Sequence, residues 1–96
     1  MHTITNGEYE WDPVKAEANA KKHGVHFADA ALSLEDPRGF SMADPDAFGE
    51  ARWVFIGADP SGHLLVTVYT MRHQSVRIVS SRRASGFERA RYAENL

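Results

Sequence analysis

Three apolar segments follow one another closely in the second half of the chain, and they restrict the fold more than any other feature. They are "RWVFIG" (52–57), "HLLVTVYT" (63–70) and "SVRIVSS" (75–81), and the turn sequence "DPSG" separates the first two. Short apolar runs joined by turn residues indicate consecutive antiparallel strands. Because "LLVTV" is almost continuously apolar, we expect the middle strand to be central and covered on both faces.

Helices are predicted on either side of these strands. Asp12 as N-cap and Pro13 at the first helical position predict a helix that ends at Gly24, which suits a left-handed cap. "SGFE" (85–88) matches a capping box and predicts a last helix that runs to about residue 94. The other predicted elements are a strand at 8–11, a helix at about 28–34 and a strand at 39–42. This order predicts an α+β fold, with a small, largely antiparallel sheet, two N-terminal helices and one C-terminal helix.

Composition limits the classes of protein and site. The chain has 96 residues, which suits a single domain over 1–96. No apolar run approaches the ~20 residues that a membrane-spanning helix needs, and we expect no membrane partner. The absence of cysteine excludes disulfides and thiolate metal sites and fits a cytoplasmic location. No two histidines have helical metal-site spacing together with a carboxylate, and no glycine-rich phosphate loop is present, so we expect neither a metal nor a cofactor.

Charge is divided unevenly along the chain. From Arg72 onward six arginines oppose two glutamates, a net of +4, whereas residues 1–71 carry a net of −6, within a total of −2. Such asymmetry indicates an anionic partner on one side, and the alternative is a pair of solvated faces. Arg82 and Arg83 precede the predicted last helix, where exposed N–H groups favour an anion and guanidinium groups bind phosphate bidentately.

The sequence alone does not bring these arginines together in one site, because the expected strand geometry keeps them apart. In a hairpin, Arg72 lies near the turn and Arg82 some 20 Å away, at ~3.3 Å per residue. Alternation places Arg77 and Arg82 on opposite faces unless a bulge intervenes. Simpler alternatives remain open for other candidates: a solvent-facing Arg77, a helix-capping Lys22 or His23, a solvated His73, and a Tyr69 that fills space over the sheet.

Several stretches together resemble BrnT-type toxins. They are "YEWDPVKAEANAKKHGVHFADA", "RWVFIG", "LLVTVYTMR", "RIVSSRRAS" and "ERARY", in the family's order over roughly residues 8–93. The resemblance implies a RelE-like fold and a metal-independent ribonuclease toxin of a type II toxin–antitoxin pair. It also implies a BrnA-type antitoxin that binds DNA, so that the toxin meets DNA only through its partner. A heterotetramer with the antitoxin is one assembly that fits.

The resemblance also implies a mechanism and a set of site residues. In this fold the RNA 2′-hydroxyl attacks the neighbouring phosphate while the protein stabilises charge and transfers protons. The implied catalytic residues are Arg72, Arg82, Tyr69 and His23. The implied RNA-binding residues are Arg77, Arg83, Lys22 and His73. The proton donor stays open among Tyr69, His23, His73 and Lys22.

A second hypothesis belongs to a different class of protein. The same charge division fits a non-catalytic binding module, whose basic C-terminal half docks an acidic partner or a nucleic acid. RNA binding without cleavage would favour this alternative.

Overall fold

Six strands form one sheet in the part of the chain that the structure describes, residues 4–6 and 8–95 of a computed structural model. The strands are β1 (Ile4–Asn6), β2 (Tyr9–Trp11), β3 (Phe40–Ala43), β4 (Trp53–Ala58), β5 (Leu64–Arg72) and β6 (Ser75–Arg83). The helices are α1 (Pro13–His23), α2 (Phe27–Ser33) and α3 (Gly86–Glu94). No helix among these residues is long and apolar enough to cross a membrane.

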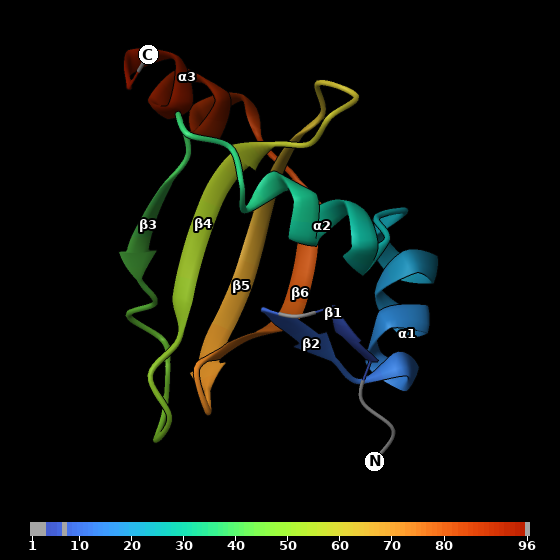
Figure 1. Ribbon diagram of the computed structural model, residues 1–96. Helices are drawn as coiled ribbons and strands as arrows, with labels where there is room; N and C mark the ends of the chain where they lie inside the picture. Colours follow the sequence, from blue (N-terminus) through green and yellow to red (C-terminus); the bar gives the residue numbers. More distant parts are fainter. Residues whose placement is uncertain (1–3, 7, 96) are drawn as a thin grey trace.

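The strand order in the sheet is β1-β2-β6-β5-β4-β3 (Figure 1). Strands β3 to β6 pair antiparallel in sequence order, which confirms the predicted meander, and β5 is an inner strand as expected. Two features were not predicted. Strand β1 extends the sheet beyond β2, and β2 pairs with β6 in parallel, so that β2 lies between β1 and the last strand.

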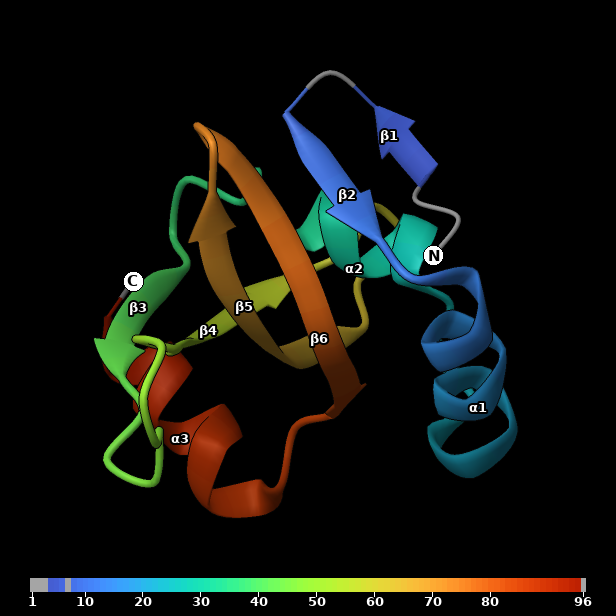
Figure 2. The same ribbon diagram turned by 90° about the horizontal axis from the view of Figure 1, so that it is seen from below.

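Helices cover both faces of the sheet, with α2 and α3 on opposite sides (Figure 2). The core beneath α2 contains Trp11, Phe27 and Ile78, each less than a tenth exposed. The rings of Trp11 and Phe27 meet edge to face, with centroids 6.2 Å apart. This core therefore joins β2, β6 and α2, segments that are distant in the sequence.

Both predicted capped helices are confirmed. The Asp12 side chain accepts a hydrogen bond from the Val14 N–H at 2.9 Å, and Gly24 ends α1 with a left-handed φ of 70°. Ser85 and Glu88 form the reciprocal capping box of α3. The local chemistry of these residues thus determines where α1 and α3 begin.

A β-bulge interrupts the long hairpin of β5 and β6. Val68 pairs with Ser80, but the next residue, Tyr69, pairs with Ile78, so that Val79 is the extra residue on β6. The bulge shifts the alternation of β6 by one residue. Side chains that strict alternation would place on opposite faces of the sheet therefore share one face.

Candidate functional site

Three arginines lie on the sheet face opposite α2, and we call them the arginine row: Arg72, Arg77 and Arg82. Arg82 is paired with Val66 and Arg77 with Thr70, so both share the face of Arg72, which is an even number of residues further along β5. Ile78, paired with Tyr69, belongs to the core on the other face. Arg77 and Arg82 therefore point the same way because of the bulge, without which alternation along β6 would place them on opposite faces.

The arginine row extends along the sheet. Arg72 and the residue opposite Arg82 are six positions apart on β5, which is about 20 Å at ~3.3 Å per residue. The separation expected from the sequence therefore holds, although the three side chains share a face. Such a row is suited to a chain of phosphates more than to a single small anion.

Each arginine of the row has a carboxylate partner from another element. Arg72 pairs with Glu50 of the β3–β4 loop, Arg77 with Glu10 of β2, and Arg82 with Glu88 of α3. The Arg72 and Arg82 side chains are each 46% exposed, whereas that of Arg77 is 11% exposed. Arg72 and Arg82 are therefore accessible to a ligand, and Arg77 is largely enclosed between β2 and β6.

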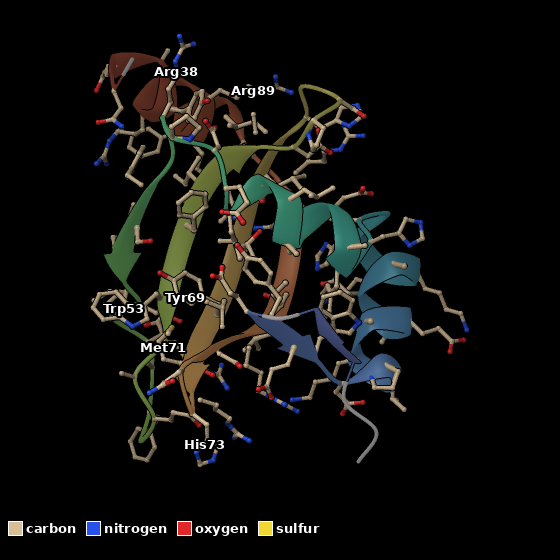
Figure 3. The ribbon with its side chains drawn as sticks, viewed as in Figure 1. Arg38, Trp53, Tyr69, Met71, His73 and Arg89 are labelled. Atoms are coloured by element: carbon tan, nitrogen blue, oxygen red, sulfur yellow. The ribbon has the colours of Figure 1, made fainter. Side chains whose placement is uncertain are left out.

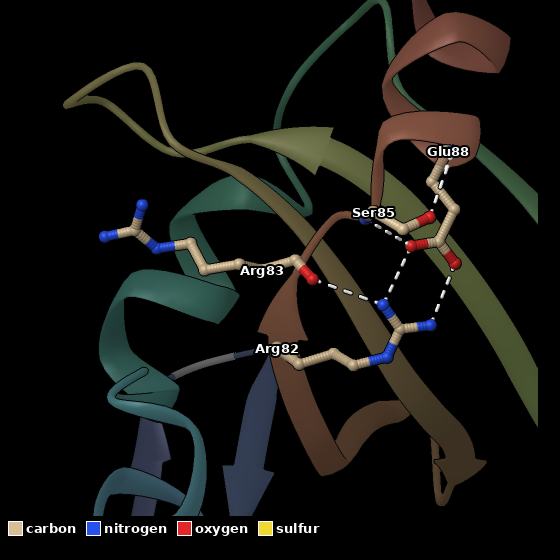
Figure 4. Close-up of polar contacts among 4 residues, drawn as sticks. All are labelled: Arg82, Arg83, Ser85 and Glu88. Atoms are coloured by element: carbon tan, nitrogen blue, oxygen red, sulfur yellow. Dashed lines mark hydrogen bonds and ion pairs between the residues drawn. The ribbon is translucent and has the colours of Figure 1, made fainter.

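Three hydrogen bonds hold the guanidinium of Arg82. Its Nη1 and Nη2 donate to the two carboxylate oxygens of Glu88 at 2.8 Å each, and Nη1 also donates to the Arg83 carbonyl at 3.2 Å (Figure 4). These bonds from Arg82, with those from Ser85, outweigh burial and lower the pKa of Glu88 to about 2. The predicted anion site before α3 is thus occupied by a carboxylate of α3 itself.

Arg72 lies at the opposite end of the row, beside the β5–β6 turn. Its Nη2 is 3.4 Å from a carboxylate oxygen of Glu50, a loose and exposed contact. His73 and Gln74 form the turn with positive φ values of 48° and 71°, and Figure 3 shows His73 at the tip of the hairpin. His73 therefore neighbours Arg72 but lies far along the sheet from α3.

Tyr69 does not lie with the arginine row. It is on the α2 face, where its hydroxyl is 2.9 Å from the hydroxyl of Ser41 on β3. Figure 3 shows it near Trp53 and Met71, at the lower ends of β4 and β5. Tyr69 and Met71 line a hollow of about 260 Å³ on this face. The sheet thus separates Tyr69 from the three arginines.

Lys22 and His23 lie in the last turn of α1, outside the sheet. Asn19, one turn earlier on the face of His23, is buried and bonds through its side chain to Val25 and to both backbone groups of Ser81. This face of α1 is therefore directed toward the end of β6. Lys22 is exposed, and His23 is partly exposed.

Arg83 points away from the Arg82–Glu88 pair (Figure 4). It lines a hollow of about 120 Å³ together with Gly24, Asp59 and His63. The Nδ1 of His63 is 3.5 Å from a carboxylate oxygen of Asp59. The adjacent residues Arg82 and Arg83 thus serve opposite sides of the sheet, as alternation along a strand requires.

Sequence reasoning missed the carboxylates that hold the arginine row. Glu88 had a signal, because a glutamate at the N3 position reaches back toward the residues that precede the helix. Glu10 and Glu50 had no such signal in the sequence, since each contacts its arginine only after segments distant in the sequence have come together in the fold. Among residues 4–6 and 8–95, no three side chains of metal-ligating type gather into a metal site.

The family described as "Ribonuclease toxin, BrnT, of type II toxin-antitoxin system" matches residues 11–88. The crystal structure of the Brucella abortus ribonuclease toxin BrnT is similar to this chain, with a TM-score of 0.58 and 24% identity. The match covers 78% of this chain and 92% of that one. No curated protein sequence matches the chain.

Proposed function

Since the chain belongs to the BrnT family of ribonuclease toxins of type II toxin–antitoxin systems, we propose that it cleaves RNA by attack of the 2′-hydroxyl on the neighbouring phosphate. The 2′-oxygen forms a bond to phosphorus, and the bond from phosphorus to the 5′-oxygen breaks. The 2′-hydroxyl loses its proton, and the departing 5′-oxygen gains one. The products are a 2′,3′-cyclic phosphate and a 5′-hydroxyl, and the reaction needs no metal ion.

The observation that supports this mechanism most is the geometry of Arg82. Negative charge builds up on the phosphate oxygens as the fifth bond to phosphorus forms. A preorganised donor stabilises this charge without reorganisation, and removal of one such donor typically costs about 10²–10³-fold in rate. Arg82 is both half exposed and held by two 2.8 Å hydrogen bonds. Arg72, about 20 Å further along the same face, would bind a phosphate several nucleotides away on the same strand.

Substitution of Arg82 tests the assignment. We expect Arg82→Ala to lose about 100-fold or more of its RNA-cleaving activity, and Arg82→Lys to recover only part, because a point charge does not reproduce the planar fork. Arg91→Ala is the matched control, since Arg91 is an exposed residue of α3. Full activity in a folded Arg82→Ala protein would refute the role of Arg82.

The chemistry has its own test. Cleavage should continue in EDTA, and RNA with 2′-O-methyl groups should stay intact, because it lacks the attacking hydroxyl. End-group analysis should find cyclic phosphates. RNA binding without any cleavage by the wild-type protein would instead support a non-catalytic binding module.

Proton transfer is assigned less directly than charge stabilisation. The candidates for the acid and the base are Tyr69, His23, His73 and Lys22, and they are not equally placed for a phosphate at Arg82. Tyr69 lies on the far face of the sheet and His73 at the other end of the arginine row, whereas Lys22 and His23 lie in the last turn of α1. Single replacements, Tyr69→Phe and alanine at the other three positions, should identify the groups by the loss of one limb of the pH–rate profile. Loss of rate without a change in the shape of the profile would argue for a binding role.

An antitoxin partner follows from the family. We propose that this partner is a BrnA-type protein that binds DNA, that it neutralises the toxin in the cytoplasm, and that the two form a heterotetramer. Co-expression with the product of a short adjacent gene should restore growth and give a complex whose mass reveals the stoichiometry. Growth arrest that persists despite a bound partner would contradict neutralisation.

A further inference from the structure

The hydrogen bonds of Arg82 leave one particular side of its guanidinium unused. A guanidinium has five N–H donors. Nη1 donates to Glu88 and to the Arg83 carbonyl, and Nη2 donates once to Glu88. Within the described part of the chain, the N–H of Nε and the second N–H of Nη2 have no partner. These two N–H groups are parallel and form the side-on fork that matches two oxygens of a phosphate.

Glu88 occupies the other fork and is itself well fixed. Its Oε1 accepts from the Ser85 N–H at 2.8 Å as well as from Nη1 of Arg82, and its backbone N–H donates to the Ser85 hydroxyl at 3.2 Å. The Glu88 side chain is only 19% exposed, against 46% for Arg82. The carboxylate therefore lies on the protein side of the guanidinium, and the exposed part of Arg82 remains outside.

From this arrangement we propose that Glu88 is a positioning residue, which holds Arg82 so that its side-on fork, Nε–H and Nη2–H, receives two non-bridging oxygens of the scissile phosphate. The inference rests on the proposed ribonuclease function and extends it. The carboxylate remains bound to the end-on fork while the phosphate binds. Glu88 thereby has a second role beyond capping α3, because it orients a side chain at the end of β6.

The rival possibility is that Glu88 competes with the phosphate. If the Glu88 carboxylate had to leave Arg82 before the phosphate could bind, it would slow the reaction. Substitution of Glu88 would then raise kcat or lower KM. A carboxylate that positions the arginine has the opposite effect, since small misplacement of a reacting group can cost about 10²-fold. The two possibilities therefore differ in the sign of the effect of Glu88→Gln.

The test compares cleavage of a mixed-sequence oligoribonucleotide by matched variants. We expect Glu88→Gln to lower kcat about 10- to 100-fold, because an amide offers one acceptor in place of two. Tyr92→Phe is the control for α3: it removes the hydrogen bond from Tyr92 to Asp36 but leaves the Glu88–Arg82 pair. It should lower the melting temperature and leave kcat unchanged. In an Arg82→Lys background, which has no fork to position, Glu88→Gln should have no further effect.

A second measurement reports on the fork directly. Titration with the 2′-O-methyl form of the oligonucleotide, which cannot react, should shift the ¹⁵Nε–H resonance of Arg82, and the shift should shrink in Glu88→Gln. A Glu88→Gln protein as active as wild type, or an equal loss in Tyr92→Phe, would overturn the inference alone. A wild-type protein inert towards RNA would overturn the proposed function and, with it, the inference.

Discussion

Asn19 is expected to be the polar side chain whose loss unfolds the protein most readily. It is 7% exposed and makes three hydrogen bonds. Its Nδ2 donates to the carbonyls of Val25 at 3.0 Å and Ser81 at 2.8 Å, and its Oδ1 accepts from the Ser81 N–H at 3.0 Å. Asn19 thus joins α1 both to β6 and to the segment that leads into α2.

The expected cost of Asn19→Ala follows from these contacts. Three hydrogen bonds at about 1 kcal/mol each give roughly 3 kcal/mol, and leaving the backbone groups of Ser81 unsatisfied adds to this, because that residue is 1% exposed. Alanine offsets at most about 0.7 kcal/mol through its higher helix propensity. A net loss of about 3 kcal/mol is large for a domain whose total stability is on the order of 5–15 kcal/mol.

Chemical denaturation followed by circular dichroism measures this loss, and thermal melting should show a drop of roughly 12 to 24 °C. Glu17→Ala is the matched control. Glu17 lies on the same helix, and its side chain is 70% exposed and pairs with Lys21 at the surface, so its loss should change the free energy of unfolding by less than about 0.5 kcal/mol. A loss below about 1 kcal/mol in Asn19→Ala would refute the view that these bonds hold α1 to the sheet.

Three further predictions concern the contacts around the sheet. Tyr92→Phe should cost about 1 kcal/mol in urea unfolding, because it removes the 2.6 Å hydrogen bond from Tyr92 to Asp36, and an unchanged midpoint would contradict this. Glu10→Ala should cost about 2 kcal/mol by the same assay, since it removes the partly buried ion pair with Arg77; an effect no larger than that of an exposed substitution would show the pair to be dispensable. The folded-state pKa of Glu88, about 2, lies below its ordinary value of 4.5, so this group stabilises the fold above pH 4.5 and loses that contribution as the pH falls toward 2. Glu88→Gln should flatten the pH dependence of stability in that window, and identical profiles for the two proteins would speak against the pairing.

Elements with local signals could be predicted closely. The N-cap at Asp12, the left-handed Gly24 and the capping box of Ser85 and Glu88 act within a few residues, and the structure has each of them as predicted. The meander was also predictable, because short turns connect its strands. The parallel pairing of β2 with β6 was not, since it joins residues 9–10 to 76–77, and no local pattern records such a contact.

The candidate site, like the fold, could be predicted only in part. Its residue types could be read from the sequence, and Arg72 and Arg82 emerged as candidates from their positions at strand ends and from the family resemblance. Their surroundings could not. Tyr69 lies on the far face from the arginine row, and Arg83 lines a separate hollow beside α1. Side-chain direction depends on exact strand register, and a single extra residue reverses it.

The amino-acid sequence by itself determined the helices, the antiparallel meander, the family and the concentration of arginine in the last quarter of the chain. Those properties arise from caps, turns, apolar periodicity and composition, which act over short stretches of chain. Only the tertiary structure decided that Arg72, Arg77 and Arg82 share one face and that Glu88 holds Arg82. Both outcomes depend on the bulge at Val79 and on the packing of α3 against the sheet. They depend on these features because pairing register and long-range ion pairs are set by the fit of whole elements, and no short segment of sequence contains that information.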